Sequence, residues 1–539
     1  MKDISSTGSF VDFTLENFIY VDKTVYIPQL VKLKRVFISR PRRFGKSLTL
    51  DTIATLFETG VEPYFKGTWI YDKWTEPTYP VLRLNFLNFD KNTLEKFNNK
   101  LNSKITEFAE LNQVTTYKEK DEAEDSIDHL LEQLRLEGRQ IVILIDEYDC
   151  QMTANINNET LYKQFQEKIK SFYATIKNKW PIKFLGITGV TRLKDVEIFS
   201  IGSDIRDITN ASAYSQMIGF TRDEIKKYYI DYLKLASSYE NNCSVDNVTD
   251  EQIESMLDMM AQNYDGYCFD EFYKKKVFST WSVNSFFQSI IENKFVDFGD
   301  YWYDNGGLPS ILVNYLKTHK LNSLDYVEKD KTITIRVNDF KNPTSLTSIN
   351  QNVLMCQTGY LTLRSPVYSK GFMTLGMPNS EVYNALLSLM ALNIFDDTKL
   401  ENVNEQILSQ SKDVGEIIEL FNTVLNTVSY DNYPISSEAV VQQLLYMYLK
   451  GICNSVSAEL HSSKGRADLV IESDNRRIVF EFKYAKNEIE AKVKLSEAIE
   501  QIKTRDYGNI VPKKAELLRI AAVFNADPKV RAFTEYHEV

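Results

Sequence analysis

Segment 141–147 is the feature that most restricts the fold, because an unbroken apolar run ends there in two carboxylates. The segment reads Ile-Val-Ile-Leu-Ile-Asp-Glu. A run of this kind is typical of a strand buried on both faces, and such strands occur in parallel sheets covered by helices. Ligands bind to open α/β sheets at the carboxyl ends of the strands. The segment therefore predicts a buried parallel strand that presents acids at a binding edge.

Strand-like and helix-like runs alternate through the first 200 residues. Apolar, β-rich segments lie at 36–39, 79–86, 140–145 and 182–188, and amphipathic helical stretches lie between them at 94–111, 127–136 and 160–177. This alternation predicts a parallel sheet with flanking helices.

The remainder of the 539 residues divides into three further segments. Residues 221–400 look mostly helical and are rich in Tyr and Phe, with short strand-like pieces near 332–337 and 359–363. Residues 401–431 look like a helical connector, and Asn-Tyr-Pro at 432–434 begins a last α/β unit. We predict an α/β multidomain chain with domains at 1–220, 221–400, 401–431 and 432–539.

Composition narrows the class of protein. The net charge of -11 argues against a protein that coats nucleic acid nonspecifically. Residues 434–539 carry 16 Lys and Arg against 15 Asp and Glu, so this segment is close to neutral. The five cysteines are scattered without a C-x-x-C spacing, which indicates reduced thiols and no structural zinc. With no secretory or membrane-spanning pattern, we expect a cytoplasmic location.

The segment 36–50 reads as a strand, a tight basic loop and a helix, which is the arrangement of a P-loop. Gly45 would let the backbone approach phosphate, Lys46 would reach the terminal phosphates, and Ser47 would hold Mg²⁺ at the helix N-terminus. A glycine usually precedes Gly45 by five residues, and here Arg40 takes that place. Gly-Lys-Ser alone also fits an ordinary basic turn, but together with the acidic strand end it predicts an ATP site.

The ends of two other strands complete this site. Asp146 would bind Mg²⁺ through water, and Glu147 would orient or polarise the attacking water. The strand 184–188 runs into Gly-Val-Thr-Arg at 189–192, where Arg192 is our candidate for sensing the γ-phosphate and Thr188 is the alternative. A solvated surface arginine is the competing interpretation of Arg192.

A second cluster of charged residues lies near the C-terminus. Residues 465–472 read as a strand, 473–477 as a polar turn, and 478–483 as a second strand. Pairing about the middle of that turn sets Asp468 opposite Lys483. Glu481 and Lys483 then share one face of the second strand, and Phe480 and Phe482 fill the other.

This cluster has the chemistry that phosphodiester hydrolysis requires. Asp468 and Glu481 would hold Mg²⁺, and Lys483 would position the nucleophile or stabilise the pentacovalent charge. A solvated edge strand is the competing interpretation. The apolar surroundings of the charges argue against it, because buried charges are costly unless they are paired or bound to metal.

Four motifs resemble the AAA-ATPase-like family that is usually fused to a PD-(D/E)XK nuclease domain. They are Tyr-Val-Asp-Lys-Thr at 20–24, Arg-Pro-Arg-Arg-Phe-Gly-Lys-Ser at 40–47, Ile-Asp-Glu-Tyr-Asp at 145–149 and Thr-Gly-Val at 188–190. The family's own loop carries arginine where Arg40 stands. Further similarities lie at 219–221, 263–267, 281–282 and 358–361, so the resemblance covers nearly the whole chain.

The resemblance implies a nucleotide site and a restriction-endonuclease-like α/β domain. The expected contacts to ATP and Mg²⁺ are Arg43, Gly45, Lys46, Ser47, Leu48, Asp146 and Arg192. Two departures from the family lie beside this site: Cys-Gln at 150–151 replaces Lys-Pro, and Ser-Thr at 279–280 replaces Asn-Pro.

The resemblance adds further candidates to the C-terminal site. Gly-Arg-Ala-Asp at 465–468 and Glu-Phe-Lys at 481–483 are close to the nuclease domain of this fusion. Glu438, at the start of the helix 437–449, matches the position of an additional metal-binding acid, and Glu459 competes for that role. Gln501 resembles a glutamine that orients the catalytic lysine or a phosphate, although a surface amide is an equally good interpretation.

We therefore expect an ATP-driven or ATP-gated nuclease. Its partners would be ATP and nucleic acid, with DNA favoured over RNA, and a homo-oligomer is left open. One alternative is a signalling or scaffold ATPase whose nuclease-like domain binds without cutting. A secreted toxin built on the same domains is a third interpretation, for which the N-terminus offers no support.

Overall fold

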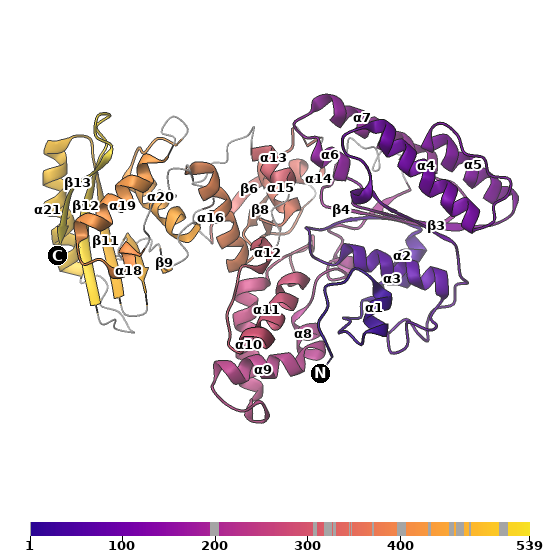
Figure 1. Cartoon of the computed structure of the whole chain (residues 1–539), viewed down its shortest axis with the longest axis horizontal. Coiled ribbons are helices and arrows are strands. Elements are labelled where there is room, and N and C mark those ends of the chain that lie inside the picture. Colours follow the sequence, from indigo (N-terminus) through magenta and orange to yellow (C-terminus); the bar gives the residue numbers. More distant parts are fainter. Residues whose placement is uncertain are drawn as a thin grey trace. The chain divides into compact units, whose positions relative to one another are not determined.

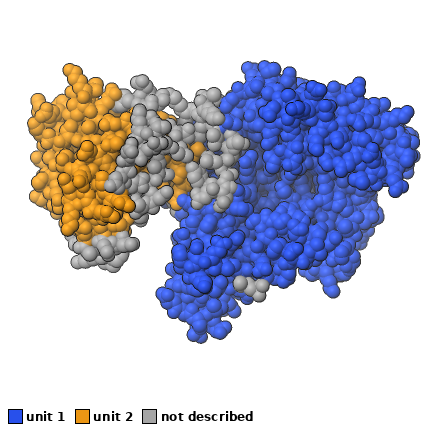
Figure 2. Space-filling model, in the orientation of Figure 1, with its two compact units in different colours: residues 1–320, 330–382 blue, residues 321–329, 383–539 orange. Residues whose placement is uncertain are grey.

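The computed structural model of the chain separates into two compact units (Figure 2). The first comprises residues 1–320 and 330–382, and the second comprises 321–329 and 383–539. Whether the four predicted domains are independent folding units stays a prediction. The residues whose structure is described are 2–193, 204–304, 310–316, 326, 330–343, 345–346, 348–368, 371–395, 406–428, 433–451, 457–459, 468–473, 476–505 and 516–539.

A five-stranded sheet forms the base of the first unit, in the order β2-β3-β4-β1-β5. All neighbouring strands are parallel. The predicted parallel sheet is thus confirmed, and the apolar run that suggested it is buried along its whole length. The strands are β1 (Arg35–Ser39), β2 (Val81–Asn85), β3 (Ile141–Asp146), β4 (Ile182–Gly189) and β5 (Arg206–Asp207).

Helices cover both faces of this sheet. Figure 1 shows α4, α5 and α7 on one side and α2 and α3 on the other. Helix α4 buries Leu101, Ile105 and Phe108, the apolar stripe that its sequence predicts. The helices are α1 (Phe10–Leu15), α2 (Ile27–Leu33), α3 (Lys46–Thr59), α4 (Leu94–Leu111), α5 (Ala123–Leu136), α6 (Cys150–Ala154) and α7 (Glu159–Ile176).

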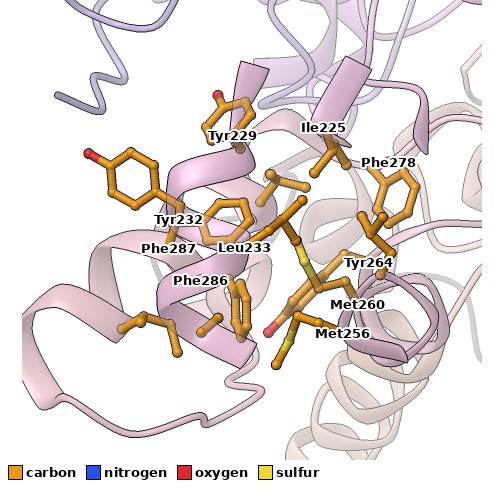
Figure 3. Close-up of a cluster of buried hydrophobic side chains, with 14 of the residues drawn as sticks. Ile225, Tyr229, Tyr232, Leu233, Met256, Met260, Tyr264, Phe278, Phe286 and Phe287 are labelled. Carbon is orange, nitrogen blue, oxygen red and sulfur yellow. The ribbon is translucent and has the colours of Figure 1, made fainter. Parts of the chain in front are cut away.

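The middle of the chain is mostly helical, as predicted. Helices α8 (Arg222–Tyr228), α9 (Ile230–Glu240), α10 (Asp250–Tyr264) and α11 (Thr280–Asn293) enclose a core of Tyr, Phe, Met and Leu side chains (Figure 3). Capping boxes at Thr221 and Thr249 start α8 and α10. The remaining helices are α12 (Tyr301–Asp304), α13 (Ser310–Leu316), α14 (Val337–Lys341), α15 (Gln351–Thr358) and α16 (Ser380–Ile394).

A small antiparallel sheet accompanies these helices, in the order β6-β8-β7. Its strands are β6 (Ile333–Arg336), β7 (Thr362–Leu363) and β8 (Phe372–Gly376). Both strand-like pieces that the sequence indicated in this region are present.

The second unit contains a mixed sheet, in the order β13-β12-β11-β10-β9. Strands β11 and β12 are parallel, and the other neighbours are antiparallel. The predicted C-terminal α/β region is confirmed. Its elements are α18 (Ile407–Gln410), α19 (Val414–Asn426), α20 (Glu438–Gly451), β9 (Ser457–Glu459), β10 (Leu469–Glu472), β11 (Arg476–Ala485), α21 (Glu488–Arg505), β12 (Glu516–Asn525) and β13 (Ala532–Glu538).

The predicted register of the C-terminal hairpin is wrong by two residues. Leu469 pairs with Phe480, so the ladder does not set Asp468 opposite Lys483. The reason is that Arg476 and Arg477, which we assigned to the turn, are buried strand residues. Arg477 forms an ion pair with Glu472 across the ladder. Because side chains alternate with a period of two, a shift by two residues leaves each side chain on its predicted face.

Among the described residues, no helix combines the length and the apolar character needed to cross a membrane.

Candidate functional site

The loop of residues 40–45, called the phosphate loop below, joins β1 to α3. It ends at a glycine whose backbone conformation is left-handed. Gly45 directly precedes the first residue of α3. Its φ is +99°, a value that residues with a side chain rarely adopt. Lys46 is buried, and its Nζ donates to the carbonyl oxygen of Pro41 at 3.0 Å and lies 3.7 Å from Glu147 Oε1. The lysine thus points back over the loop, where a phosphate would replace the carbonyl oxygen as its partner.

The ends of four elements meet at the carboxylate of Asp146. Ser47 Oγ donates to Asp146 Oδ2 at 2.6 Å, and Thr188 Oγ1 donates to Oδ1. Asn85, opposite Asp146 in the β2–β3 register, lies 3.5 Å away through Nδ2. A serine hydroxyl beside a carboxylate suits Mg²⁺, which prefers hard oxygen ligands. These residues therefore fit the Mg²⁺–nucleotide pair that the sequence predicts.

Glu147 directly follows Asp146 and has a left-handed backbone conformation. Its φ is +53°, and its carboxylate approaches Lys46. Burial raises the pKa of Glu147, and the charges of Asp149 and Asp146 raise it further, against the opposing charge of Lys46. A carboxylate with a raised pKa is suited to accept a proton from water.

The next acid in the chain, Asp149, makes hydrogen bonds that the sequence did not suggest. Asp149 is buried and accepts hydrogen bonds from the backbone N–H of Thr191, at 2.7 Å, and from the Thr191 hydroxyl. Tyr148 OH donates to the carbonyl oxygen of Thr191 at 3.1 Å. Asp149 therefore positions the segment after β4. The run of three acids in Asp-Glu-Tyr-Asp could have suggested that they divide their roles.

The two sensor candidates lie in different places. Thr188 contacts Asp146, whereas the Arg192 side chain forms an ion pair with Asp207 on β5. The backbone N–H of Arg192 donates to Gln357 Oε1 at 3.2 Å. Thr188 thus contacts Asp146, whereas Arg192 pairs with Asp207, and which of the two senses the γ-phosphate stays a prediction.

A cavity of about 500 Å³ adjoins the phosphate loop. Its lining includes Arg43, Lys46, Ser47, Leu48 and Glu147, whereas Arg192 is not part of it. Aromatic side chains also line it, among them Tyr20, Tyr229 and Trp281. A cavity of this size, lined by apolar, aromatic and charged side chains, fits a nucleotide whose phosphates lie on the loop.

Arg40, which replaces the usual first glycine, is a buried anchor for the phosphate loop. Its guanidinium donates to the carbonyl oxygens of Ser39, at 2.9 Å, and Thr209, at 2.7 Å. The same group lies 4.1 Å from the ring centre of Phe269 in the middle segment. Burial lowers the pKa of Arg40 to about 9. This arginine holds the loop in place and is not one of the residues that line the 500 Å³ cavity.

Arg43 and its neighbours make a second set of contacts to the middle segment. The Arg43 guanidinium lies 3.9 Å from the ring centre of Trp281, and the Arg43 carbonyl oxygen accepts from Thr280 Oγ1 at 2.9 Å. Phe44 packs edge-on against Tyr267, with ring centres 4.7 Å apart. Thr280 is one of the departures from the family pattern, and it contacts the loop directly.

A third contact explains the Thr-Gly-Tyr-Leu motif at 358–361. A Cβ on Gly359 would lie 2.8 Å from Pro41 Cβ, and the φ of Gly359 is +97°. Trp302 Nε1 donates to the carbonyl oxygen of Arg42 at 3.4 Å. The scattered middle-segment motifs therefore surround the phosphate loop. Sequence reasoning noticed these motifs but not their convergence.

The C-terminal cluster forms around a buried glutamate. Glu481 is fully buried, and Lys483 Nζ donates to Glu481 Oε1 at 2.8 Å and lies 3.4 Å from Glu438 Oε1. Burial lowers the pKa of Lys483, but the hydrogen bond and charge of Glu481 outweigh it, so that the pKa of Lys483 is raised. The structure thus brings Glu438, Glu481 and Lys483 together.

Asp468 joins this cluster through the backbone of β11. Its N–H donates to the Phe480 carbonyl oxygen at 3.1 Å, and its Oδ2 accepts from the Phe482 N–H at 2.7 Å. Burial and, next, the charge of Glu481 raise the pKa of Asp468 to about 7. Gln442, which sequence reasoning missed, donates through Nε2 to the Asp468 carbonyl oxygen.

Aromatic side chains form the opposite face of β11, as predicted. The rings of Phe480 and Phe482 stack with centres 5.5 Å apart, and Phe421 of α19 lies 5.1 Å from Phe480. This packing fixes the strand that carries Glu481 and Lys483.

The remaining candidates differ in how far the structure places them. Glu459 is in β9, but its side chain and the Gly-Arg-Ala part of the motif lie outside the described residues. Gln501 is on α21, which packs on β10 and β11 through Ala498 and Ile502, and its role stays a prediction.

Among the described residues, no three Asp, Glu, His or Cys side chains form a group able to hold one metal ion. Asp468 and Glu481 are therefore the carboxylate pair that this region offers to a hard divalent cation.

Comparisons with known proteins agree with this division of the chain. Residues 5–199 match the family model described as Predicted AAA-ATPase, and residues 436–533 match that of the PD-(D/E)XK nuclease superfamily. Both resemblances inferred from the motifs are thereby confirmed. A protein of Azotobacter chroococcum mcd 1, described as an uncharacterized protein in the vnfD 5' region, is 25% identical over 95% of this chain and 94% of its own length.

The crystal structure of Cdc6p from Pyrobaculum aerophilum is also similar to this chain. The similar region covers 67% of this chain and 88% of the Cdc6p chain, with 10% sequence identity and a TM-score of 0.21.

Proposed function

We propose that this chain hydrolyses ATP in its first unit and nucleic acid phosphodiester bonds in its second. The proposal is supported by the match of residues 5–199 to an AAA-ATPase-like family model and of residues 436–533 to the PD-(D/E)XK nuclease superfamily. The substrate we favour is DNA. ATP binding would control whether nucleic acid is cut.

The observation that carries the nuclease proposal is the position of Asp468 beside the buried Glu481. Placing two carboxylates together away from water is costly, and the pKa of Asp468, raised to about 7, reflects that cost. Perturbed carboxylates next to a lysine are typical of functional sites. A bound divalent cation would compensate the two charges, polarise water and stabilise charge on the phosphate.

The chain's own residues then have separate roles. Asp468 and Glu481 hold the cation, and Glu481 also accepts a hydrogen bond from Lys483. Lys483 positions the attacking water or the phosphate. Its three N–H groups donate to Glu481, to the Phe482 carbonyl oxygen and, at 3.4 Å, to Glu438, and the water or phosphate would replace this longest contact. Glu438 holds the lysine from the start of α20.

In the first unit, the phosphate loop and Lys46 bind the β- and γ-phosphates of ATP. Ser47 and Asp146 hold the Mg²⁺ that accompanies ATP, and Glu147 accepts the proton of the attacking water. Thr188, which reaches Asp146, is favoured over Arg192 as the residue that senses the γ-phosphate.

The test is a cleavage assay on the full chain with single-stranded DNA, duplex DNA and RNA. It uses Mg²⁺, Mn²⁺, Ca²⁺ or a chelator, each with and without ATP. We expect cleavage with Mg²⁺ or Mn²⁺, little with Ca²⁺, and a loss of at least about 100-fold in Lys483→Ala. Asp413→Asn in the same unit is the control, because Asp413 is an exposed helix cap that Asn replaces well.

Titration calorimetry with the same metals separates the possible failures. A chain that binds Mg²⁺ in the second unit but cuts no nucleic acid would support the scaffold alternative. A chain that neither cuts nor binds metal there would refute the nuclease proposal.

A further inference from the structure

We propose that a basic and aromatic surface on the first unit binds single-stranded nucleic acid. This inference rests on the proposed nuclease function and adds a contact surface outside both predicted catalytic sites. The surface consists of two aromatic and three basic side chains: Phe272, Tyr368, Lys274, Lys275 and Lys276.

The loop that carries the lysines is held in one conformation by a buried acid. Asp270 is fully buried, and its two oxygens accept from the N–H groups of Phe272 and Lys274, each at 3.0 Å. Tyr273 between them has φ of +56°. The Glu271 N–H donates to the carbonyl oxygen of Asn210 at 2.9 Å. An ordered loop can bind a ligand with little loss of conformational entropy.

The aromatic side chains are exposed although they lie on ordered backbone. The exposed fractions are 55% for Phe272 and 65% for Tyr368. The Val367 N–H donates to the Glu271 carbonyl oxygen at 2.8 Å, which holds the segment with Tyr368 against the lysine loop. Exposed rings on a fixed platform suit base stacking, which any base can provide.

The charge of the surface selects the class of partner. Lys275 Nζ donates to the carbonyl oxygen of Ser212, and Lys276 Nζ lies 5.5 Å from the Tyr273 ring centre. Neither contact neutralises the ammonium group. None of the three lysines forms an ion pair with a side chain in the described part of the chain. In a chain of net charge -11, three adjacent exposed lysines attract a polyanion.

The combination favours a single strand over a duplex. Lysines contact phosphates in both cases, but the aromatic rings can stack only on bases that are not already stacked in a helix. A purely acidic polymer such as polyglutamate would satisfy the lysines but would offer no planar group to the two exposed rings.

The first unit also connects this loop to the ATP site. The loop follows Phe269, whose ring packs on Arg40 of the phosphate loop. The surface therefore lies on an element that the phosphate loop contacts, which places nucleic acid binding next to nucleotide binding in the same unit.

The test measures fluorescence anisotropy of the full chain with labelled dT20, U20 and a duplex, in a chelator so that cleavage plays no part. We expect both single strands to bind more tightly than the duplex. Phe272→Ala or Tyr368→Ala should weaken binding roughly 5- to 150-fold, the range for loss of one stacked base. Replacing Lys274, Lys275 and Lys276 together with Glu should lower the slope of affinity against salt by about 2, at about 0.7 for each phosphate contact.

Matched variants elsewhere on the first unit are the controls. Trp180→Ala removes an exposed aromatic ring, and a triple Glu variant of the exposed Lys66, Lys96 and Lys100 makes the same change in net charge. Neither should reproduce the losses, and ATP affinity should be unchanged in all variants.

Three results would overturn the proposal. They are equal effects of the two lysine triples, no loss in either aromatic variant, and displacement of dT20 by polyglutamate as readily as by unlabelled dT20. The measurement needs neither Mg²⁺ nor cleavage, so a chain that cuts nothing but shows the expected losses would refute the proposed nuclease and leave this surface supported.

Discussion

Replacing Asp468 with Asn is expected to stabilise the second unit above pH 7 while it abolishes cleavage. The pKa of Asp468 is raised from its ordinary 3.8 to about 7, by burial and by Glu481. A raised carboxyl pKa means that ionising the group costs free energy in the folded state. Asn keeps an oxygen that can accept from the Phe482 N–H but carries no charge.

The size of the effect follows from the two pKa values. At about 1.36 kcal/mol for each pKa unit, the difference between 3.8 and about 7 corresponds to about 4 kcal/mol. Relaxation of the site reduces this value, so we expect about 1–3 kcal/mol. The unfolded chain releases its proton near pH 3.8 and the folded chain only near pH 7. The parent chain therefore loses stability as pH rises across this window, and the advantage of the variant grows until about pH 7.

Hydrogen-exchange mass spectrometry of β11 and β12 peptides, without metal, measures this advantage in the full chain. The gain of Asp468→Asn should be larger at pH 8 than at pH 5, after correction for intrinsic exchange. Asp413→Asn should differ from the parent by less than about 0.5 kcal/mol at both pH values. A variant no more stable than the parent at pH 8, or a gain of equal size at both pH values, would refute the electrostatic argument.

Four further outcomes follow from the geometry of the two sites. Lys46→Ala should weaken ATP binding about 10- to 150-fold, as measured by titration calorimetry, because it removes a charged hydrogen-bond donor to phosphate. Glu147→Gln should keep ATP affinity but lose phosphate release in a steady-state assay, and loss of binding instead would contradict its role as a base. Arg40→Gly, which restores the usual glycine, should destabilise the first unit by about 3 kcal/mol or more in chemical unfolding, since two charged hydrogen bonds are lost. Affinity of the second unit for Mn²⁺ should rise between pH 6 and pH 8, because the cation must displace the proton of Asp468, and a flat profile would exclude that carboxylate as a ligand.

Local patterns were sufficient for the architecture of the first unit and for both clusters of candidate residues. Buried parallel strands need apolar residues on both faces, so the run that ends at Asp146 identifies the central strand without any knowledge of its neighbours. The parallel order also brings the ends of strands to one edge, which is why Ser47 and Asp146, both expected to hold Mg²⁺, lie in contact; that they bind Mg²⁺ stays a prediction. In the C-terminal hairpin, the period of two put Glu481 and Lys483 on one face, and this held although the register was wrong.

The tertiary structure decided the points that depend on residues distant in sequence. Arg476 and Arg477 look like turn residues, and their burial and the Glu472 ion pair place them in the strand. Arg40 takes the place of the usual first glycine, and only the structure shows what it contacts there: the ring of Phe269, more than 200 residues later, lies against its guanidinium. Arg192 follows a strand end, which suggested a role in sensing phosphate, and only the structure shows its ion pair with Asp207. Side-chain periodicity is a local property of the backbone, whereas the partner of a buried charge is chosen by packing between segments that the sequence leaves far apart.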